Sequence, residues 1–383
     1  MNFGIKALRK ELHRYPELSG SETQTARRIK AFIELHHPTK IIDQLGGNGI
    51  AAIYEFSDSG PSIAIRCELD ALPIEEENEF EYKSTISGVS HKCGHDGHMA
   101  IVAGLIFWIK EQSFKSGRII LLFQPAEETG QGAYAVLQDD RFGALDIDYM
   151  FALHNIPGEP LHSIITMDQG FSAEVQSFAI EVKGRESHAS EPEVGINPAG
   201  VISEMIAALD KLNNHDPENE HFAILTPVYM NMGQKSYGIS PAKGELHYTI
   251  RTWSPEKMIH LKSEIEAFFN AVCIREELTF KVRWFEHFPA SRNDAECVQL
   301  VNKAASEQGF NIIERPYPFK FGEDFGWFSQ KYQSAMFGLG AGLETPALHE
   351  PDYDFPEAII ETGINMFSKI ISLVFEKHIN PGE

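Results

Sequence analysis

The sequence has few cysteines and no long uninterrupted apolar run. Its four cysteines, Cys67, Cys93, Cys273 and Cys297, form no Cys-x-x-Cys pair. This pattern excludes a disulfide framework and fits a reducing compartment, the cytoplasm. A membrane-spanning helix needs about 18 or more consecutive apolar residues, and the sequence contains no such run and no apolar core of a signal peptide near its N-terminus. We therefore expect a cytoplasmic protein with no membrane partner.

Basic residues are also scarce. Lysine and arginine together number 33, against 55 aspartates and glutamates, and the formal net charge is −22. Proteins that bind nucleic acids carry a basic face, so we expect no nucleic-acid partner. The chain has 383 residues, of which 43% are hydrophobic, and this length favours two domains over one.

Short apolar segments alternate with helical ones in the first part of the chain. This alternation predicts an α/β fold, in which helices flank both faces of a central mixed sheet. The predicted strands are 49–56, 62–67, 118–123 and 148–153, and the main predicted helix is 99–110.

The middle of the chain has a different rhythm. Between residues 172 and 285, strand and helix patterns follow one another in the order β-α-β-β-α-β, which is typical of a ferredoxin-like domain. We predict that 172–285 is a domain inserted into a larger one, which comprises residues 1–171 and 286–383. The predicted strands of the insert are 176–182, 223–230, 245–252 and 278–284, and its predicted helices are 198–212 and 255–272.

The segment HKCGHDGH, residues 91–98, packs a thiol, three imidazoles and a carboxylate into eight positions. Cysteine and histidine are preferred ligands of zinc and its neighbours. The Cys-x-His spacing lets the side chains of Cys93 and His95 converge from a loop ahead of the predicted helix. We interpret the segment as part of a metal site, with a polar loop that carries incidental histidines as the alternative.

Two adjacent glutamates, Glu127 and Glu128, follow the predicted strand 118–123 after a short turn. Carboxylates at a buried strand end are costly unless a positive charge compensates them. A metal ion would do so, and then one carboxylate can ligate while its neighbour serves as general base. A solvated acidic turn is the alternative explanation for this pair.

Three more residues gain meaning only in combination. His154 follows the predicted strand 148–153, Asp70 follows strand 62–67, and His349 lies far downstream in the segment ALHEP. Taken singly, each histidine fits a core or capping role, and Asp70 fits a surface turn. The strand-end glutamates, His154 and the Cys/His segment fall on one edge of the predicted sheet, where Asp70 could orient a ligating imidazole.

Taken in order, the motifs of the chain resemble a known family. They are similar to those of the amidohydrolase branch of the dimetal aminoacylase and carboxypeptidase family, which includes hippurate hydrolases, auxin-conjugate hydrolases and N-acetyldiaminopimelate deacetylases. The resemblance runs from LHRYPELSGSE at residues 12–22 to LHEPDYDF at residues 348–355. The matching motifs are RCELDALP, HKCGHDGHMA, FQPAEETGQGA, LHNIPG, KGRESHA, TIRT, GEDF and LHEPDYDF.

The resemblance implies a metal-dependent hydrolase that cleaves the amide bond of N-acyl amino acids, N-acetyl or N-aromatic-acyl, with a metal-activated water. Glu127 would be the general base and then the proton donor to the leaving amine. His188 in KGRESHA would polarise the scissile carbonyl across a dimer interface made by the inserted lid domain, and Arg251 in TIRT would bind the substrate carboxylate. Two divalent ions, of zinc, manganese, cobalt or nickel, would be held by five ligands: Cys93, His95, Glu128, His154 and His349.

The chain also departs from the family's pattern. Gly238 stands where the family has a lid asparagine, Glu68 replaces the first aspartate of the RxDxDALP motif, and KGRESHA lacks a Gly-Gly pair before its histidine. These departures concern the substrate rather than the metals. A dipeptidase or an N-carbamoyl-amino-acid hydrolase is one alternative function, and a non-catalytic protein that binds metal or a small molecule is another. The pair Glu127–Glu128 argues against the non-catalytic binding protein, because such a protein needs metal ligands but no general base.

Overall fold

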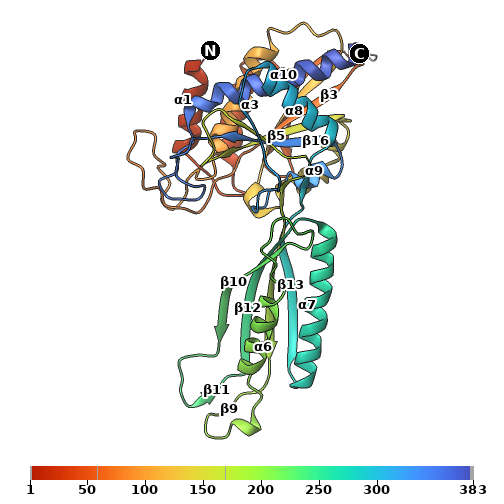
Figure 1. Cartoon of the computed structure of the whole chain (residues 1–383). Coiled ribbons are helices and arrows are strands. Elements are labelled where there is room, and N and C mark those ends of the chain that lie inside the picture. Colours follow the sequence, from red (N-terminus) through yellow and green to blue (C-terminus); the bar gives the residue numbers. More distant parts are fainter. Residues whose placement is uncertain (1, 58, 169, 380–383) are drawn as a thin grey trace. The chain divides into compact units, whose positions relative to one another are not determined.

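The computed structural model describes residues 2–57, 59–168 and 170–379. The chain forms two compact units. Unit 1 comprises Met1–Phe171, Ser291–Pro318 and Glu323–Glu383, and unit 2 comprises Ser172–Ala290 and Phe319–Gly322. Unit 2, coloured from green to teal in Figure 1, is therefore an insertion into the chain of unit 1.

A mixed eight-stranded sheet forms the centre of unit 1, with the order β1-β2-β4-β3-β5-β16-β6-β15. Strands β4, β3, β5 and β16 run parallel to one another. The pairs β1–β2, β2–β4 and β16–β6 are antiparallel. The fold class predicted from the alternating pattern is confirmed. The strands are β1 (Lys40–Leu45), β2 (Gly49–Ser57), β3 (Ser62–Glu68), β4 (Gly117–Gln124), β5 (Tyr149–Ile156), β6 (Ile164–Thr166), β15 (Ile312–Glu314) and β16 (Gln333–Gly340).

Helices pack on this sheet around a large apolar core. The central one, α3, is buried on nearly every side between α1, α10 and strand β3, and Figure 1 shows it crossing close to α10. A Cβ at Gly104 would lie 2.4 Å from Cδ1 of Ile364, so a larger residue there would have to displace the end of that side chain. The helices are α1 (Asn2–Arg14), α2 (Thr23–Glu34), α3 (His95–Ile109), α4 (Gly132–Leu137), α5 (Asp140–Gly143), α8 (Ala295–Glu307), α9 (Gly326–Ser329) and α10 (Ile360–Ile379).

Helix α3 begins four residues earlier than the sequence predicted. The predicted start was residue 99, but His95 is already the first helical residue. Gly94 makes this possible: its φ of 95° lies in the left-handed region, which favours glycine, and its carbonyl accepts the first bonds of the helix from Gly97 and His98. Cys93 therefore lies on the segment before the helix, whereas His95 and His98 lie on its first turn.

One helical stretch, Glu357–His378, is long and apolar enough by composition to cross a membrane, with a mean hydropathy of 1.5 in its most apolar window. The structure buries 67% of that window, and α10, which makes up most of the stretch, packs against α3 and α8. A buried core helix has the same composition, so this single stretch is weak support for a membrane span.

Unit 2 is a four-stranded antiparallel sheet, in the order β10-β12-β8-β13, with two helices. Inward-facing residues of β8 and β12 alternate with outward-facing ones, and the inward set packs with α6 and α7 in one apolar core. The predicted ferredoxin-like order is confirmed. The elements are β8 (Glu174–Lys183), α6 (Ala199–Asp210), β10 (Ala223–Met232), β12 (Lys243–Thr252), α7 (Pro255–Arg275) and β13 (Thr279–Phe288).

Candidate metal centre

Unit 1 brings all five predicted metal ligands together. The carboxyl ends of the parallel strands β3, β4 and β5 meet at one edge of the sheet, so the residues that follow them are neighbours. Potential ligand atoms within 4.8 Å of one another form overlapping groups, three of which contain only predicted site residues. These three are Cys93, His95 and His154; Cys93, Glu128 and His349; and His95, Glu127 and Glu128.

Hydrogen bonds orient the two buried imidazoles toward this cluster. Nδ1 of His95 lies 2.9 Å from the carbonyl oxygen of Asp70 and 3.3 Å from its Oδ1, so Nε2 is left to face the cluster. Nδ1 of His154 lies 2.9 Å from the carbonyl oxygen of Asn155, and its Nε2 lies 3.5 Å from Sγ of Cys93. Such bonds to the second nitrogen are what metal-ligating histidines usually have.

Asp70 links the two sides of the cluster. Its Oδ2 accepts hydrogen bonds from the backbone N–H of Glu128 at 2.9 Å and from the hydroxyl of Ser19 at 2.7 Å. Asp70 also contacts the imidazole of His95, so it holds the side chain of one predicted ligand, His95, and the backbone of another, Glu128. This is the position expected of a residue that orients ligands.

Two buried polar atoms of the cluster test whether a cation fits. Nε2 of His95 and Oε1 of Glu128 have no hydrogen-bond partner among the described residues. They lie 3.8 Å apart, which is too long for a hydrogen bond, and Nε2 lies 3.9 Å from Oε2 of Glu127. Unpartnered buried donors and acceptors are costly, and a divalent cation would satisfy both. The mixture of thiolate, imidazole and carboxylate is suited to zinc and similar metals.

The acid–base properties of the cluster agree with this. Burial raises the pKa of the Cys93 thiol and, together with the carboxylate of Glu323, that of Glu127. Burial also raises the pKa of Glu128 to about 7, although the charge of His95 opposes it. Burial lowers the pKa of His95, but hydrogen bonding from Asp70 and the charges of Glu68, Asp70 and Glu128 outweigh this and raise it to about 10. Anionic ligands that burial disfavours are ionised by a bound cation.

His349 is the most exposed of the five predicted ligands. It lies in the loop between β16 and α10, its side chain is 52% exposed, and its Nε2 is 4.0 Å from Oε2 of Glu128. Its backbone has a φ of 70° and donates a hydrogen bond to the carbonyl of Lys92 at 2.8 Å. This bond ties the loop to the residue that immediately precedes Cys93.

The other two predicted site residues belong to unit 2. His188 lies in β9 (Ser187–His188), is exposed, and pairs with Ile239 of β11 (Ile239–Ser240). Its Nδ1 lies 2.6 Å from the hydroxyl of Ser190. Arg251 on β12 donates from Nη1 to the carbonyl of Lys320 at 2.6 Å, and burial lowers its pKa.

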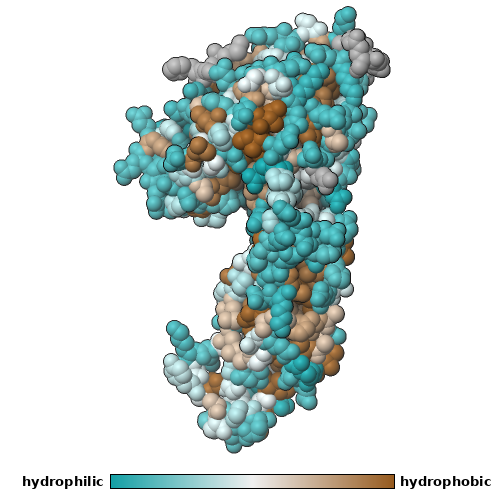
Figure 2. Space-filling model, in the orientation of Figure 1, coloured by the Kyte–Doolittle hydropathy of each residue, from teal (hydrophilic) through white to brown (hydrophobic). Residues whose placement is uncertain are grey.

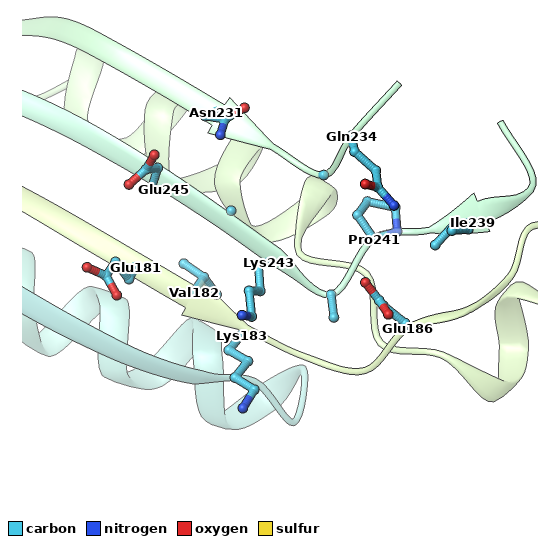
Figure 3. Close-up of a pocket in the computed structure, with 13 residues that line it drawn as sticks. Glu181, Val182, Lys183, Glu186, Asn231, Gln234, Ile239, Pro241, Lys243 and Glu245 are labelled. Carbon is cyan, nitrogen blue, oxygen red and sulfur yellow. The ribbon is translucent and has the colours of Figure 1, made fainter. Parts of the chain in front are cut away.

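A hollow of about 600 Å³ lies within unit 2, at the end of β8 and the start of β12. Figure 3 shows that lysines and glutamates from these strands and the loop after β8 line it. Lys243 and Lys183 are direct cross-strand partners there, next to the partners Glu245 and Glu181. The potential metal-ligand groups of the described residues lie in unit 1 instead.

Comparison with known proteins identifies the family. A model of peptidase family M20/M25/M40 matches residues 64–373. The chain belongs to this family. It is 33% identical over 357 residues to the N-acetyl-L-cysteine deacetylase of Bacillus subtilis (strain 168), with 92% of this chain and 84% of the relative covered. It is 27% identical over 373 residues to a second protein of that strain, N-acetylcysteine deacetylase, with 96% of both chains covered.

Solved structures have the same fold. The Bacillus subtilis YXEP protein, a dinuclear metal binding peptidase, superposes with a TM-score of 0.83 at 25% identity over 98% of both chains. A structure from methicillin-resistant Staphylococcus aureus gives a TM-score of 0.87 at 23% identity, with 98% of this chain and 97% of that chain covered. The predicted family and the predicted enzyme class, a metal-dependent amidohydrolase, are confirmed, and the ligand cluster fits two divalent ions.

Several charged residues of the site escaped prediction from the sequence. The sequence pattern indicates no role for Arg66 or Glu68, which lie in RCELDALP, nor for Glu323 or Asp324, which lie in GEDF. It also indicates no role for His98 of HKCGHDGH, whose Nδ1 lies 2.6 Å from Oε2 of Glu68. All five are buried. The available signal was their position directly at strand ends or beside the motifs, where a charged residue must be paired.

Proposed function

We propose that this M20-family protein hydrolyses the amide bond of N-acyl amino acids, with N-acetyl amino acids as the first class to test and N-aromatic-acyl amino acids as the second. The proposal rests on one arrangement: a Cys/His/carboxylate cluster with a further buried carboxylate, Glu127, within 4.8 Å of two of its members. The names of the two Bacillus subtilis relatives, both deacetylases of N-acetylcysteine, support the acetyl group.

The cluster has the donors needed for two divalent ions, and zinc, manganese, cobalt and nickel all suit it. When bound, such ions polarise a carbonyl and acidify water. Glu127 takes the proton of the attacking water and delivers it to the leaving nitrogen. Asp70 keeps the imidazole of His95 in the orientation described above. The metals would be held by Cys93, His95, Glu128, His154 and His349.

Unit 2 contributes the remaining groups in this proposal. His188 stabilises the developing negative charge on the carbonyl oxygen from a second copy of the chain. Arg251 binds the α-carboxylate of the substrate, because a guanidinium matches a carboxylate with two parallel hydrogen bonds.

A homodimer through unit 2 has physical support. Strand β10 is at the edge of its sheet among the described residues, and an unprotected edge strand is a site for pairing with another chain. Figure 2 shows hydrophobic side chains on the visible surface of unit 2. Four large apolar residues of β10 are between 40% and 60% exposed: Val228, Tyr229, Met230 and Met232. We propose the cytoplasm as the location, on the basis of the unpaired cysteines.

The test is a substrate panel on the purified protein after metal loading. N-acetyl, N-benzoyl and N-carbamoyl amino acids and dipeptides are compared, and release of the free amino acid is measured. The proposal expects the highest kcat/KM for an N-acyl amino acid. A higher value for dipeptides or N-carbamoyl amino acids would replace it by the corresponding alternative, and metal binding without turnover of any compound would favour a binding protein.

A second arm of the panel tests the role of Arg251. The amide of the best substrate lacks the α-carboxylate, so KM should rise by about tenfold or more while the scissile bond is unchanged. An Arg251→Lys variant should discriminate less between acid and amide. Equal kcat/KM values for acid and amide in the unaltered protein would remove Arg251 from the substrate site.

A further inference from the structure

A single buried guanidinium joins the strand ends beside the metal centre. Arg66, near the end of β3, is 1% exposed. Its Nε donates to Oε1 of Gln124 at 2.8 Å, and its Nη1 donates to Oε1 of Glu68. Its Nη2 donates to Oε1 of Glu323 at 2.9 Å and to Oδ1 of Asp324 at 2.7 Å. One cation therefore faces three buried carboxylates.

The Glu323–Asp324 turn carries this interaction to Glu127. The backbone N–H of Asp324 donates to Oε1 of Glu127 at 3.3 Å, and carboxylate oxygens of Glu127, Glu323 and Asp324 lie within 4.8 Å of one another. Without a cation, three carboxylates this close would repel one another in a medium of low dielectric constant. The guanidinium lets the turn approach Glu127 closely enough for the backbone bond.

The rest of the turn is also fixed. Both carboxylate oxygens of Asp324 accept from Nε2 of Gln124 at 2.9 Å, and Oδ2 also accepts from the backbone N–H of Ala133 at 2.9 Å. Oε1 of Glu323 accepts from the backbone N–H of Phe325 at 3.0 Å. The backbone amide that meets Glu127 is thus held by the side chains of its own turn, and Arg66 contacts both of them.

We propose that Arg66 is a positioning residue for Glu127, which it aligns through the Glu323–Asp324 turn; this rests on the proposed function, in which Glu127 is the general base. Lysine cannot replace Arg66, because an ammonium group lacks the planar set of N–H donors that binds Gln124, Glu68 and the turn simultaneously.

A competing role exists on the other side of Arg66. There, His98 connects Glu68 with Asn155. Nδ1 of His98 lies 2.6 Å from Oε2 of Glu68, and Nε2 of His98 lies 2.6 Å from Oδ1 of Asn155. The carbonyl of Asn155 contacts the predicted ligand His154. If Arg66 acted mainly along this route, its loss would release metal rather than disturb Glu127.

A double-mutant cycle separates these roles. Arg66→Lys, Glu127→Gln and the double variant are prepared as full-length, metal-loaded protein, and kcat, KM and metal content are measured. Arg66→Lys alone should keep its metals and its KM but lose about 10²-fold in kcat, the usual scale for a reacting group displaced by about 1 Å. In the Glu127→Gln background the same substitution should have little further effect.

Additive effects in the cycle would mean that Arg66 acts independently of Glu127 and would overturn the proposal, as would loss of metal from Arg66→Lys. Arg118→Lys is the matched control. Arg118 is the second residue of the neighbouring strand β4, and its Nε donates to Ser62 Oγ at 2.8 Å, at the opposite end of the strands. The Arg118→Lys substitution should leave kcat unchanged.

Hydrogen exchange provides a reading that does not depend on turnover. The amides of a peptide that spans residues 322–328 should exchange faster in Arg66→Lys than in the unaltered protein, and not in Arg118→Lys. Unchanged exchange would contradict the proposal whatever the activity. If the unaltered protein cleaves nothing on the panel, the proposed function fails, while this arm still decides whether Arg66 holds the turn.

Asp324→Asn covers the case in which Arg66→Lys does not fold. It keeps the shape of the side chain and removes the charge that Arg66 binds. The proposal expects the same loss of kcat, the same absence of a further effect beside Glu127→Gln, and faster exchange over residues 322–328. Normal kcat together with unchanged exchange in this variant would overturn it.

Discussion

The two units place their charged side chains in opposite ways. Unit 1 buries charges and pairs them within hydrogen-bonded networks. Eleven charged residues among those described in unit 1 are at most 4% exposed: Arg9, Glu22, Arg66, Glu68, Asp70, Glu76, Lys92, Asp96, Glu127, Glu323 and Asp324. In unit 2, the charges of the sheet lie on its outer face, in cross-strand rows such as Glu245, Glu181 and Lys281. Glu174 is the buried carboxylate among the described residues of unit 2.

The difference shows where sequence changes are costly. A charge in the interior of unit 1 is compensated by specific partners, so removal of one partner leaves an uncompensated charge. A charge on the outer face of unit 2 is solvated and contributes little to stability. Unit 2 is specified mainly by the alternation of apolar and polar residues, whereas unit 1 carries a second pattern, the pairing of buried charges.

The largest effect is expected from Glu127→Gln. Loss of the proton shuttle should lower kcat by about 10²–10⁴-fold while both metals remain bound. The matched control is Glu245→Gln, on the outer face of unit 2, which should leave kcat unchanged. Steady-state kinetics and metal analysis of both variants provide the measurement. Near-normal kcat in Glu127→Gln would eliminate its assignment as the base.

His188→Ala tests whether unit 2 contributes chemistry at all. If His188 stabilises the oxyanion, the variant should lose about 10²–10³-fold in kcat with its metals retained. His221→Ala is a suitable control, because His221 is also an exposed histidine of unit 2 and should have no effect.

The heterodimer sharpens this test. A His188→Ala chain and a Glu127→Gln chain are co-expressed with different tags, and the mixed dimer is isolated. If His188 acts across the interface, one of the two sites is intact and activity should return to roughly half of the normal value per dimer. No recovery in a verified heterodimer would place His188 in the site of its own chain or outside catalysis.

Glu76→Gln tests the cost of a buried charge in unit 1. Oε1 of Glu76 bonds Nζ of Lys92 at 2.6 Å and lies 2.9 Å from Nε2 of His13. Burial raises the pKa of Glu76. Hydrogen bonding and charge from His13, together with the bond to Lys92, outweigh burial and lower this pKa to about 2. Removing this partner should lower the free energy of unfolding by about 3 kcal/mol.

The pH dependence has a definite sign. Because the pKa of Glu76 is depressed in the folded state, its stabilisation is complete above the unfolded pKa of about 4.3 and is lost as the pH falls toward 2. Denaturant titrations between pH 7 and pH 3 should therefore show a smaller acid destabilisation in Glu76→Gln than in the unaltered protein. Glu204→Gln, which removes an exposed partner of Arg275 in unit 2, should change neither stability nor its pH profile.

The smallest expected effect is a change in the alkylation rate of a cysteine on chelation, compared between the two units. Cys93 should react with an alkylating reagent only after chelation, because a bound metal shields the thiolate. Cys273, buried in α7 of unit 2, should react slowly with or without chelator. Mass spectrometry of each cysteine gives the rates, and equal rates at Cys93 with and without chelator would exclude it as a ligand.

The parts that were predictable from the sequence are those with a local pattern. The β-α-β-β-α-β order of unit 2 could be read from alternation alone, and the Cys-x-His spacing and the Glu127–Glu128 pair pointed to the metal centre. The start of α3 at His95 was missed, because a left-handed Gly94 makes a cap that composition does not reveal. The site contacts of Arg66 were missed because their partners lie as far away in the chain as residues 323 and 324.

The loop that carries His349 has a consequence for how the protein is made. Cys93, His95, Glu128 and His154 all precede unit 2 in the chain, whereas His349 follows it. During synthesis, the ribosome must therefore complete the whole insertion before the last proposed ligand emerges. The four earlier proposed ligands lie beside an unfinished sheet until then, since β15 and β16 also come later. If these five residues hold the metals, full metal loading requires the chain through His349, and a product truncated before it would lack one ligand.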